Sequence, residues 1–272
     1  MSTSDAVAGG TGLADENLKL VLPGKGVSAG RGVDWIGAGW KLFAKAPLMW
    51  IVALLILVVI AVLVNFVPIL GSLAFQIATP VFYAGLVVAC RSLERGGDFE
   101  LEHLFAGFKT QLANLLVVGA VFLAGMLLIL GVFALFVGFG ILGAAMSGNT
   151  DDVMPALAAS GAAILIGTLV MLLLMIPLLM AYWFAPALVI MHGMGAVAAM
   201  KASFGACLRN FIPFLIYGIV MMVLVVVAMI PFGLGLLVWI PLSFTSTYAA
   251  YRDMFTEETG GGAVAATTTT TI

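Results

Sequence analysis

Six long apolar segments dominate the sequence and limit the folds that it can adopt. They cover residues 47–67, 71–88, 115–146, 155–191, 211–230 and 232–251. A helix needs roughly 20 mostly apolar residues to cross the hydrocarbon core of a bilayer. Only 9% of the 272 residues are charged, whereas soluble domains carry about 25%. The sequence therefore predicts an all-α integral membrane protein with six transmembrane helices.

A short turn rich in proline and glycine joins the first segment to the second, and another joins the fifth to the sixth. FVPILG follows the first segment, and IPFG joins the fifth to the sixth. Such sequences favour tight reversals, so each pair is predicted to form a hairpin. The third and fourth segments are longer than one crossing needs. We expect them to tilt, to kink at Pro177 and Pro186, or to project beyond the bilayer beside the loop SGNTDDV.

The chain before the first apolar segment does not fit a signal peptide. The apolar region of a signal peptide is about 7–15 residues long and lies near the N-terminus, whereas this segment is longer and begins at Pro47. We expect the segment to stay in the mature protein. The low-complexity composition of residues 1–28 and 256–272 predicts two disordered cytoplasmic tails around a membrane domain at residues 29–255.

The basic residues predict the orientation in the membrane. With six spans, all eleven Lys and Arg residues fall on one side, and Asp151 and Asp152 fall on the other. Because Lys and Arg are enriched in cytoplasmic loops, both termini are predicted to be cytoplasmic. The expected location is the bacterial inner membrane.

The segment before the first span has the pattern of an amphipathic helix. Val33, Ile36 and Trp40 fall within a narrow arc of such a helix, and Lys41 and Lys45 fall almost opposite. Tryptophan suits the headgroup layer of a membrane, and lysine suits anionic lipid. The pattern therefore predicts a helix that lies at the cytoplasmic membrane surface.

The same apolar stripe occurs three times, each time before a pair of apolar segments whose second member contains a proline. We predict three tandem units, at about residues 29–95, 98–192 and 194–255, each a surface helix followed by a membrane hairpin. Parallel units of this kind favour a ring-like bundle around an axis near the membrane normal. The alternative is simple duplication of a stable hairpin. The residues predicted to anchor the surface helices are Ile36, Trp40, Lys41, Lys45, Leu104, Phe108, Lys109, Met200, Phe204 and Arg209.

Four short sequences carry a resemblance to a known family. With AGRGVDWI, GWKLF, ACRSLE and LEHLFAGF, the chain resembles a family of uncharacterised proteobacterial polytopic inner-membrane proteins, over about residues 29–255. The repeated hairpins are more distantly similar to the membrane domain of some glycerophosphodiester phosphodiesterases. The soluble phosphodiesterase domain has no counterpart here, so the resemblance implies a fold and no activity.

Motifs that could carry chemistry are weak in this sequence. GFGILG and GMGAVA fit dinucleotide-binding patterns but lack the acidic residue about 20 positions later that holds the ribose. Cys90, His103, His192 and Cys207 are all expected near cytoplasmic helix ends, where a zinc site is conceivable, but their spacing does not favour one. We expect no metal, no cofactor and no enzymatic activity.

Polar residues inside the predicted spans are few and uncharged. They are most simply explained by hydrogen bonds between helices, and alternatively by a path for a solute. These residues are Asn65, Gln76, Thr79, Ser243, Thr245, Ser246 and Thr247.

The function predicted from these features is that of a non-enzymatic membrane-organising protein or an accessory or scaffold subunit. It would engage lipid headgroups or a protein partner, and the acidic cluster around Asp98 could be a docking edge. The alternative is a transporter or lipid-handling protein for a neutral or amphiphilic solute. Nucleic acid is not an expected partner, because the basic residues are few and dispersed.

Overall fold

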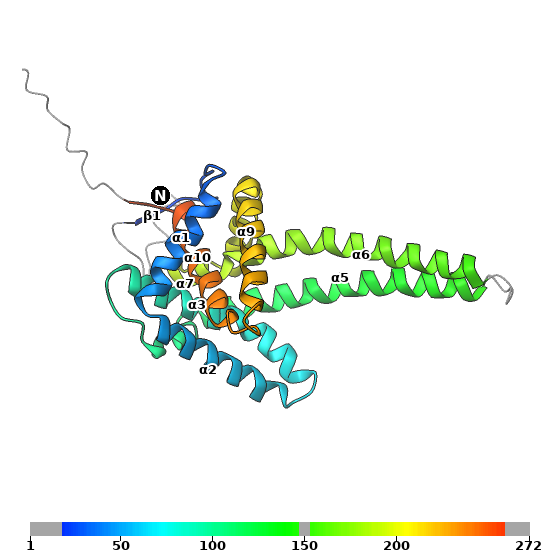
Figure 1. The fold of residues 1–272 in the computed structure, drawn as a ribbon, viewed down its shortest axis with the longest axis horizontal. Helices are drawn as coiled ribbons and strands as arrows, with labels where there is room; N and C mark the ends of the chain where they lie inside the picture. Colours follow the sequence, from blue (N-terminus) through cyan, green and yellow to red (C-terminus); the bar gives the residue numbers. More distant parts are fainter. Residues whose placement is uncertain (1–17, 147–152, 259–272) are drawn as a thin grey trace, which may run out of the picture.

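The computed structural model describes residues 18–146 and 153–258, and these are almost entirely helical (Figure 1). A single short antiparallel pair of strands, β1 (Leu18–Leu20) with β2 (Thr256–Glu258), occurs in this part of the chain. The helices are α1 (Arg31–Lys45), α2 (Pro47–Asn65), α3 (Leu70–Glu94), the 3-10 helix η2 (Leu101–Phe105), α4 (Ala106–Lys109), α5 (Leu112–Met146), α6 (Val153–Trp183), α7 (Ala185–His192), α8 (Ala196–Arg209), α9 (Phe211–Met229) and α10 (Leu236–Phe255).

Five helical stretches of the described residues are long and apolar enough to cross a membrane. They are Pro47–Asn65, Leu70–Glu94, Leu112–Gly140, Gly161–His192 and Phe211–Met229. This agrees with the predicted all-α membrane fold. The helix α10, predicted as the sixth span, is not among them, because its hydroxyl residues together with Arg252 and Asp253 lower its mean hydropathy.

The two longest helices form a hairpin that stands apart from the other helices. In Figure 1, α5 and α6 run side by side away from the rest of the molecule. With 35 residues, α5 is about 50 Å long, compared with about 30 Å for the hydrocarbon core of a bilayer. Pro177 lies inside α6, and a break at Phe184, just before Pro186, separates α6 from α7. This break is expected, because Pro186 has no backbone N–H to donate to the carbonyl four residues earlier, and a proline is best tolerated in the first turn of a helix, where α7 places it.

The core lies where α3, α7 and α10 meet α1 and α8. Almost every residue of α7 is buried, and so are the large side chains of Trp35, Tyr248 and Tyr251. Phe184, the residue before α7, and Phe255 of α10 make an edge-to-face ring contact at 5.6 Å. In contrast, the described residues of α2, α6 and α9 bury few of their apolar side chains, as helices that face lipid would.

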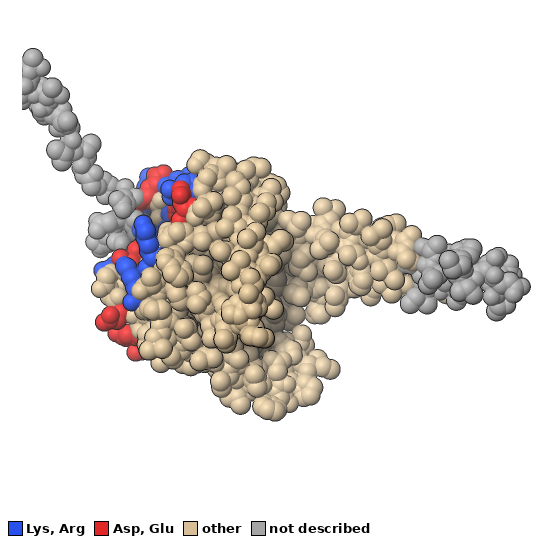
Figure 2. Space-filling view, in the orientation of Figure 1, with Lys and Arg blue, Asp and Glu red and all other residues tan. Residues whose placement is uncertain are grey.

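Charged side chains gather at one end of the molecule. Figure 2 shows Lys, Arg, Asp and Glu concentrated around α1, whereas the protruding helices are almost uniformly uncharged in this view. We call this region, which includes α1 and the C-terminal ends of α3 and α10, the charged end. It is also where the chain segments outside the apolar helices come together.

Residues 18–30, before α1, pack against the C-terminal end of α10. After β1, the Val21 amide donates to the Phe255 carbonyl and the Lys25 amide to the Met254 carbonyl, both at 2.9 Å. This differs from the predicted disorder of residues 1–28 and 256–272, because backbone hydrogen bonds hold residues 18–28 and 256–258 against the bundle. The remainder of the two predicted tails, residues 1–17 and 259–272, lies outside the described residues.

Candidate functional site

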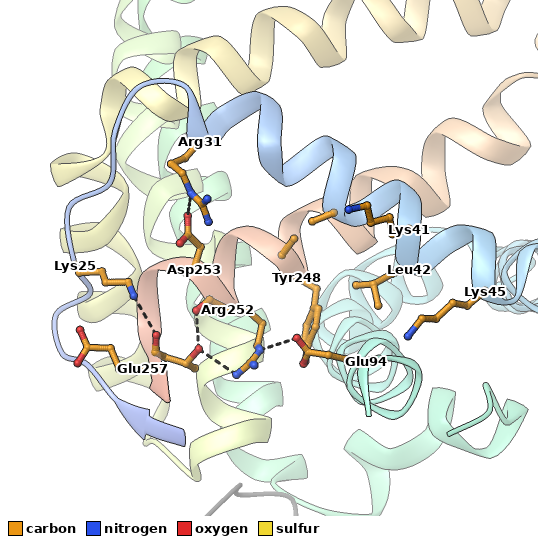
Figure 3. A pocket seen from close by; sticks show the side chains of 13 residues that line it. Lys25, Arg31, Lys41, Leu42, Lys45, Glu94, Tyr248, Arg252, Asp253 and Glu257 are labelled. Carbon is orange, nitrogen blue, oxygen red and sulfur yellow. Dashed lines mark hydrogen bonds and ion pairs between the residues drawn. The ribbon is translucent and has the colours of Figure 1, made fainter. Parts of the chain in front are cut away.

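An open groove of about 840 Å³ lies between α1 and α10 at the charged end (Figure 3). Its volume falls within the range of roughly 300–1,000 Å³ that is usual for small-molecule sites. The groove, called here the basic groove, is lined by Lys25, Arg31, Ala38, Lys41, Leu42, Lys45, Glu94, Tyr248, Ala249, Arg252, Asp253, Thr256 and Glu257.

One ion pair fixes the end of the groove near the start of α1. The Arg31 Nε donates to the Asp253 Oδ2 at 2.8 Å, and the buried Trp35 donates its Nε1 to the same oxygen at 2.9 Å. Partial burial by itself would raise the pKa of Asp253. The two hydrogen bonds outweigh this effect and hold that pKa below its ordinary value. The hydrogen bond with Asp253 in turn raises the pKa of Arg31.

A second ion pair joins the ends of α3 and α10. The Arg252 Nε donates to the Glu94 Oε1 at 3.0 Å, and the Tyr248 hydroxyl donates to the other carboxylate oxygen at 2.7 Å. Partial burial opposes the charge of Arg252, but the neighbouring Glu94 carboxylate raises its pKa overall. Both arginines of the groove are therefore held in place by carboxylates.

The three lysines of the groove, unlike its arginines, are not paired with carboxylates within the described residues. Lys25 donates to the Thr256 carbonyl at 3.3 Å, and Lys45 donates to the Leu93 carbonyl. Lys41 is exposed and makes no hydrogen bond or ion pair within the described residues. Three ammonium groups thus line the groove without a carboxylate partner in this part of the chain, which makes the groove suited to an anion.

A partly buried polar pair joins α7 to α10. The His192 Nε2 and the Tyr251 hydroxyl are 2.6 Å apart, which links α7 to α10. Arg91 of α3 is also buried in this region. Sequence reasoning did not single out Tyr248, Tyr251 or Asp253. The equal spacing of Pro80 to Arg91 and of Pro241 to Arg252 matches the ends of α3 and α10, but it does not indicate these three residues.

The predicted anchor residues have different environments, and only Lys41 and Lys45 meet in the groove. Trp40 is 50% exposed and Phe108 is also exposed, as membrane contact would need, whereas Ile36 and Phe204 are half-buried. Leu104 and Met200 are instead buried against the bundle.

The other two basic anchor residues contact other parts of the protein. Lys109 pairs with Glu102, and both side chains are exposed. Arg209 donates from Nη1 to the Gly24 carbonyl and so contacts the segment before α1.

The predicted path residues do not come together. At the turn between α2 and α3, the Ser72 hydroxyl donates to the Asn65 Oδ1 at 2.6 Å. Most of the hydroxyl groups bind carbonyls of their own helices, and the Ser246 hydroxyl also lies 2.8 Å from the Tyr217 hydroxyl. Gln76 is half-buried. None of the seven lines the basic groove or the small apolar cavity beside Trp50.

The four residues considered for zinc are not brought together into a ligand set. Over residues 18–146 and 153–258, no group of three or more His, Cys, Asp and Glu residues is placed to hold a metal ion. Cys90 and Cys207 are both buried free thiols.

Comparisons with known proteins agree with the membrane architecture. The family model described as a domain of unknown function, DUF7847, matches residues 33–272. A probable inner membrane protein of Burkholderia thailandensis is 28% identical over 253 residues, which cover 84% of this chain and 92% of that protein. No solved structure matches the chain. The similarity to a proteobacterial inner-membrane protein agrees with the resemblance seen in the sequence, and the match over most of its length shows that the chain belongs to the DUF7847 family.

Proposed function

We propose that this protein is a non-enzymatic, multi-pass inner-membrane protein that organises the membrane or acts as an accessory or scaffold subunit. It engages lipid headgroups or a protein partner at its charged end. The observation that carries this proposal is the concentration of charged side chains, together with the basic groove, at one end of an otherwise apolar molecule.

In this proposal, the charged end faces the cytoplasm and α10 is the sixth span. Its low hydropathy is compatible with a transmembrane position, because most of its polar side chains are buried inside the bundle and hydrogen-bonded. A helix that is surrounded by other helices needs less apolar surface than one that faces lipid. Arg252 and Asp253 lie at its C-terminal end, beside the groove.

Three close contacts support three tandem units arranged as a ring. A small residue follows three positions after each of the matched stripe residues Ile36, Leu104 and Met200. These small residues are Gly39, Gly107 and Ser203. Gly39 packs against Ser246 of α10, and Gly107 packs against Val81 of α3. The Ser203 hydroxyl donates to the Met180 carbonyl of α6 at 2.6 Å. The second and third surface helices thus each contact the second membrane helix of the preceding unit. The first surface helix contacts α10, the second membrane helix of the last unit.

The hydrogen bonds of the polar span residues give no support to a solute path. The hydroxyl groups of Thr79, Thr245 and Thr247 each bind a carbonyl of their own helix. A solute path would need such groups to face a shared cavity. We therefore retain the organising or accessory role and do not propose transport.

The test is native mass spectrometry of the full chain extracted together with its surrounding lipid. The proposal expects a protein partner or a stoichiometric lipid to be retained, and expects that retention to weaken when lysines of the basic groove are neutralised. Solute flux or substrate turnover by the purified protein in proteoliposomes would contradict it.

A further inference from the structure

We propose that the basic groove binds a phosphomonoester group, and that Lys41 and Lys45 make its main contacts. The inference rests on the proposed function, because it names the chemistry that the charged end would engage. The group could belong to an anionic lipid such as phosphatidic acid or to a soluble phosphorylated molecule.

The charge of the groove matches this ligand. Five cationic side chains and three carboxylates line it, which leaves an excess of two positive charges. A phosphomonoester carries a charge of about −1.5 to −2 at pH 7, whereas a phosphodiester carries about one negative charge. A monoester would therefore neutralise the groove more completely than a diester.

The excess charge is unevenly placed along the groove. Figure 3 shows Lys25 near Glu257 at one end, and Lys41 and Lys45 together on α1 at the other. The Glu94 carboxylate near Lys45 is already bound by Arg252 and Tyr248. The Lys41 and Lys45 end is therefore the part of the groove with the least compensated positive charge.

Neither of the two lysines is bound to a carboxylate within the described residues. They stand one helical turn apart on α1, so their ammonium groups can reach the same ligand. Lys41 has no hydrogen-bond or ion-pair partner within the described residues, and Lys45 donates only to the neutral carbonyl of Leu93. Exchanging a neutral acceptor for a phosphate oxygen strengthens the hydrogen bond, because the new acceptor is charged.

The neighbouring sequence favours a lipid as the source of the phosphate. Lys45 ends α1, and α2 begins at Pro47 with an apolar stretch that is long enough to span the bilayer. Trp40, next to Lys41, exposes half of its surface. A half-exposed tryptophan beside lysines at the start of a span is typical of the headgroup layer.

The test uses the full chain in phosphatidylcholine nanodiscs that also contain either phosphatidic acid or phosphatidylglycerol. Native mass spectrometry then measures the lipid that the released protein retains. We expect one phosphatidic acid to be retained in preference to phosphatidylglycerol, and the double variant Lys41→Gln with Lys45→Gln to weaken this retention about tenfold or more. The control variant is Lys201→Gln, which removes an exposed lysine of α8 outside the groove and should retain the lipid.

Further measurements separate the possible outcomes. Lys41→Gln alone should weaken retention of phosphatidic acid without a change in thermal stability, since Lys41 has no hydrogen bond or ion pair to lose among the described residues.

Saturable binding of inorganic phosphate that is abolished in the double variant, with no preference between the two lipids, would assign the site to a soluble phosphomonoester. Equal retention of both lipids with no phosphate binding, or equal retention by wild type and double variant, would overturn the inference. Retention of a protein partner in that case would leave the proposed function standing, whereas solute flux would overturn the function itself.

Discussion

Gly39 of α1 lies directly against the backbone of Ser246 of α10. A Cβ atom at position 39 would be 2.5 Å from the Ser246 nitrogen, so no larger residue fits without a shift of the two helices. The Ser246 hydroxyl lies 2.8 Å from the Tyr217 hydroxyl of α9. The contact therefore joins the first helix to the last two, and it sets the distance between the two main walls of the basic groove.

We expect Gly39→Ala to destabilise the protein. The added methyl group meets backbone atoms, which cannot rotate away, and overpacking of this kind costs about 1–3 kcal/mol. Thermal unfolding in detergent measures the effect. Gly37→Ala is the matched control, because Gly37 lies on the same helix and a Cβ atom there would meet no neighbouring atom within 4 Å. An equal melting temperature for the two variants would argue against a tight α1–α10 contact.

We expect Asn210→Ala to loosen the segment before α1. The fully buried Asn210 side chain accepts from the Val27 amide at 2.8 Å and donates to the Lys25 carbonyl at 3.0 Å. Removing it leaves partly buried backbone groups of Lys25 and Val27 without this partner, at a cost of about 1 kcal/mol or more. Hydrogen exchange over residues 18–28 should become faster. Asn114→Ala is the control, because its side chain donates to the neighbouring Gln111 side chain, and equally fast exchange in both variants would contradict the assigned role.

The sequence predicted the membrane class correctly because long apolar segments are a local property. Each of the first five predicted spans overlaps a helix that is apolar and long enough to cross a bilayer. Whether α10 crosses the membrane could not be predicted in the same way. Most of its hydroxyl residues are buried, and α10 contacts α1, α2, α3 and α9, so that burial depends on contacts between distant parts of the chain.

The groove could be predicted only in part. The amphipathic pattern identified Lys41 and Lys45 on α1, but it gave no face of this helix that packs against protein. Trp35, which is 1% exposed, packs inward, and Trp40 faces outward. Helical periodicity shows that two faces differ and does not show which face meets protein when both are apolar. The pairing of Arg31 with Asp253 joins residues at opposite ends of the chain, which no local pattern indicates.

The ion pair of Asp253 predicts a pH dependence of stability. The pKa of Asp253 is lower in the folded protein than the ordinary value of about 3.9, so the ionised carboxylate stabilises the fold. This contribution is fully present above the unfolded pKa and is lost as the pH falls through the folded pKa. The stability difference between wild type and Asp253→Asn should therefore shrink below about pH 4.

Chemical unfolding across this pH range measures the difference. Asp34→Asn is a suitable control, because the side chain of Asp34 is largely exposed and lies 3.5 Å from the same Arg31. It should change stability little at any pH. A constant difference between wild type and Asp253→Asn from pH 7 to pH 3 would show that the carboxylate does not act through its charge.

The proposed orientation predicts which engineered cysteines a membrane-impermeant maleimide can reach. The background should be low, because Cys90 and Cys207 are buried and burial raises the pKa of the Cys207 thiol to about 12. A protonated thiol reacts slowly, since the thiolate is the nucleophile. Labelling of a single engineered cysteine should therefore stand clearly above the labelling of Cys90 and Cys207.

Three positions separate the possible topologies. Lys201→Cys and Glu257→Cys lie outside the apolar helices, before α9 and after α10, and Phe232→Cys lies fully exposed in the turn between those two helices. If α9 and α10 both cross the membrane, Phe232→Cys should react in intact spheroplasts, and the other two only in inverted vesicles. Labelling of Phe232→Cys and Glu257→Cys from the same side would instead mean that α10 does not span the membrane. The basic groove would then have to be placed relative to the bilayer by α1 and α9 alone.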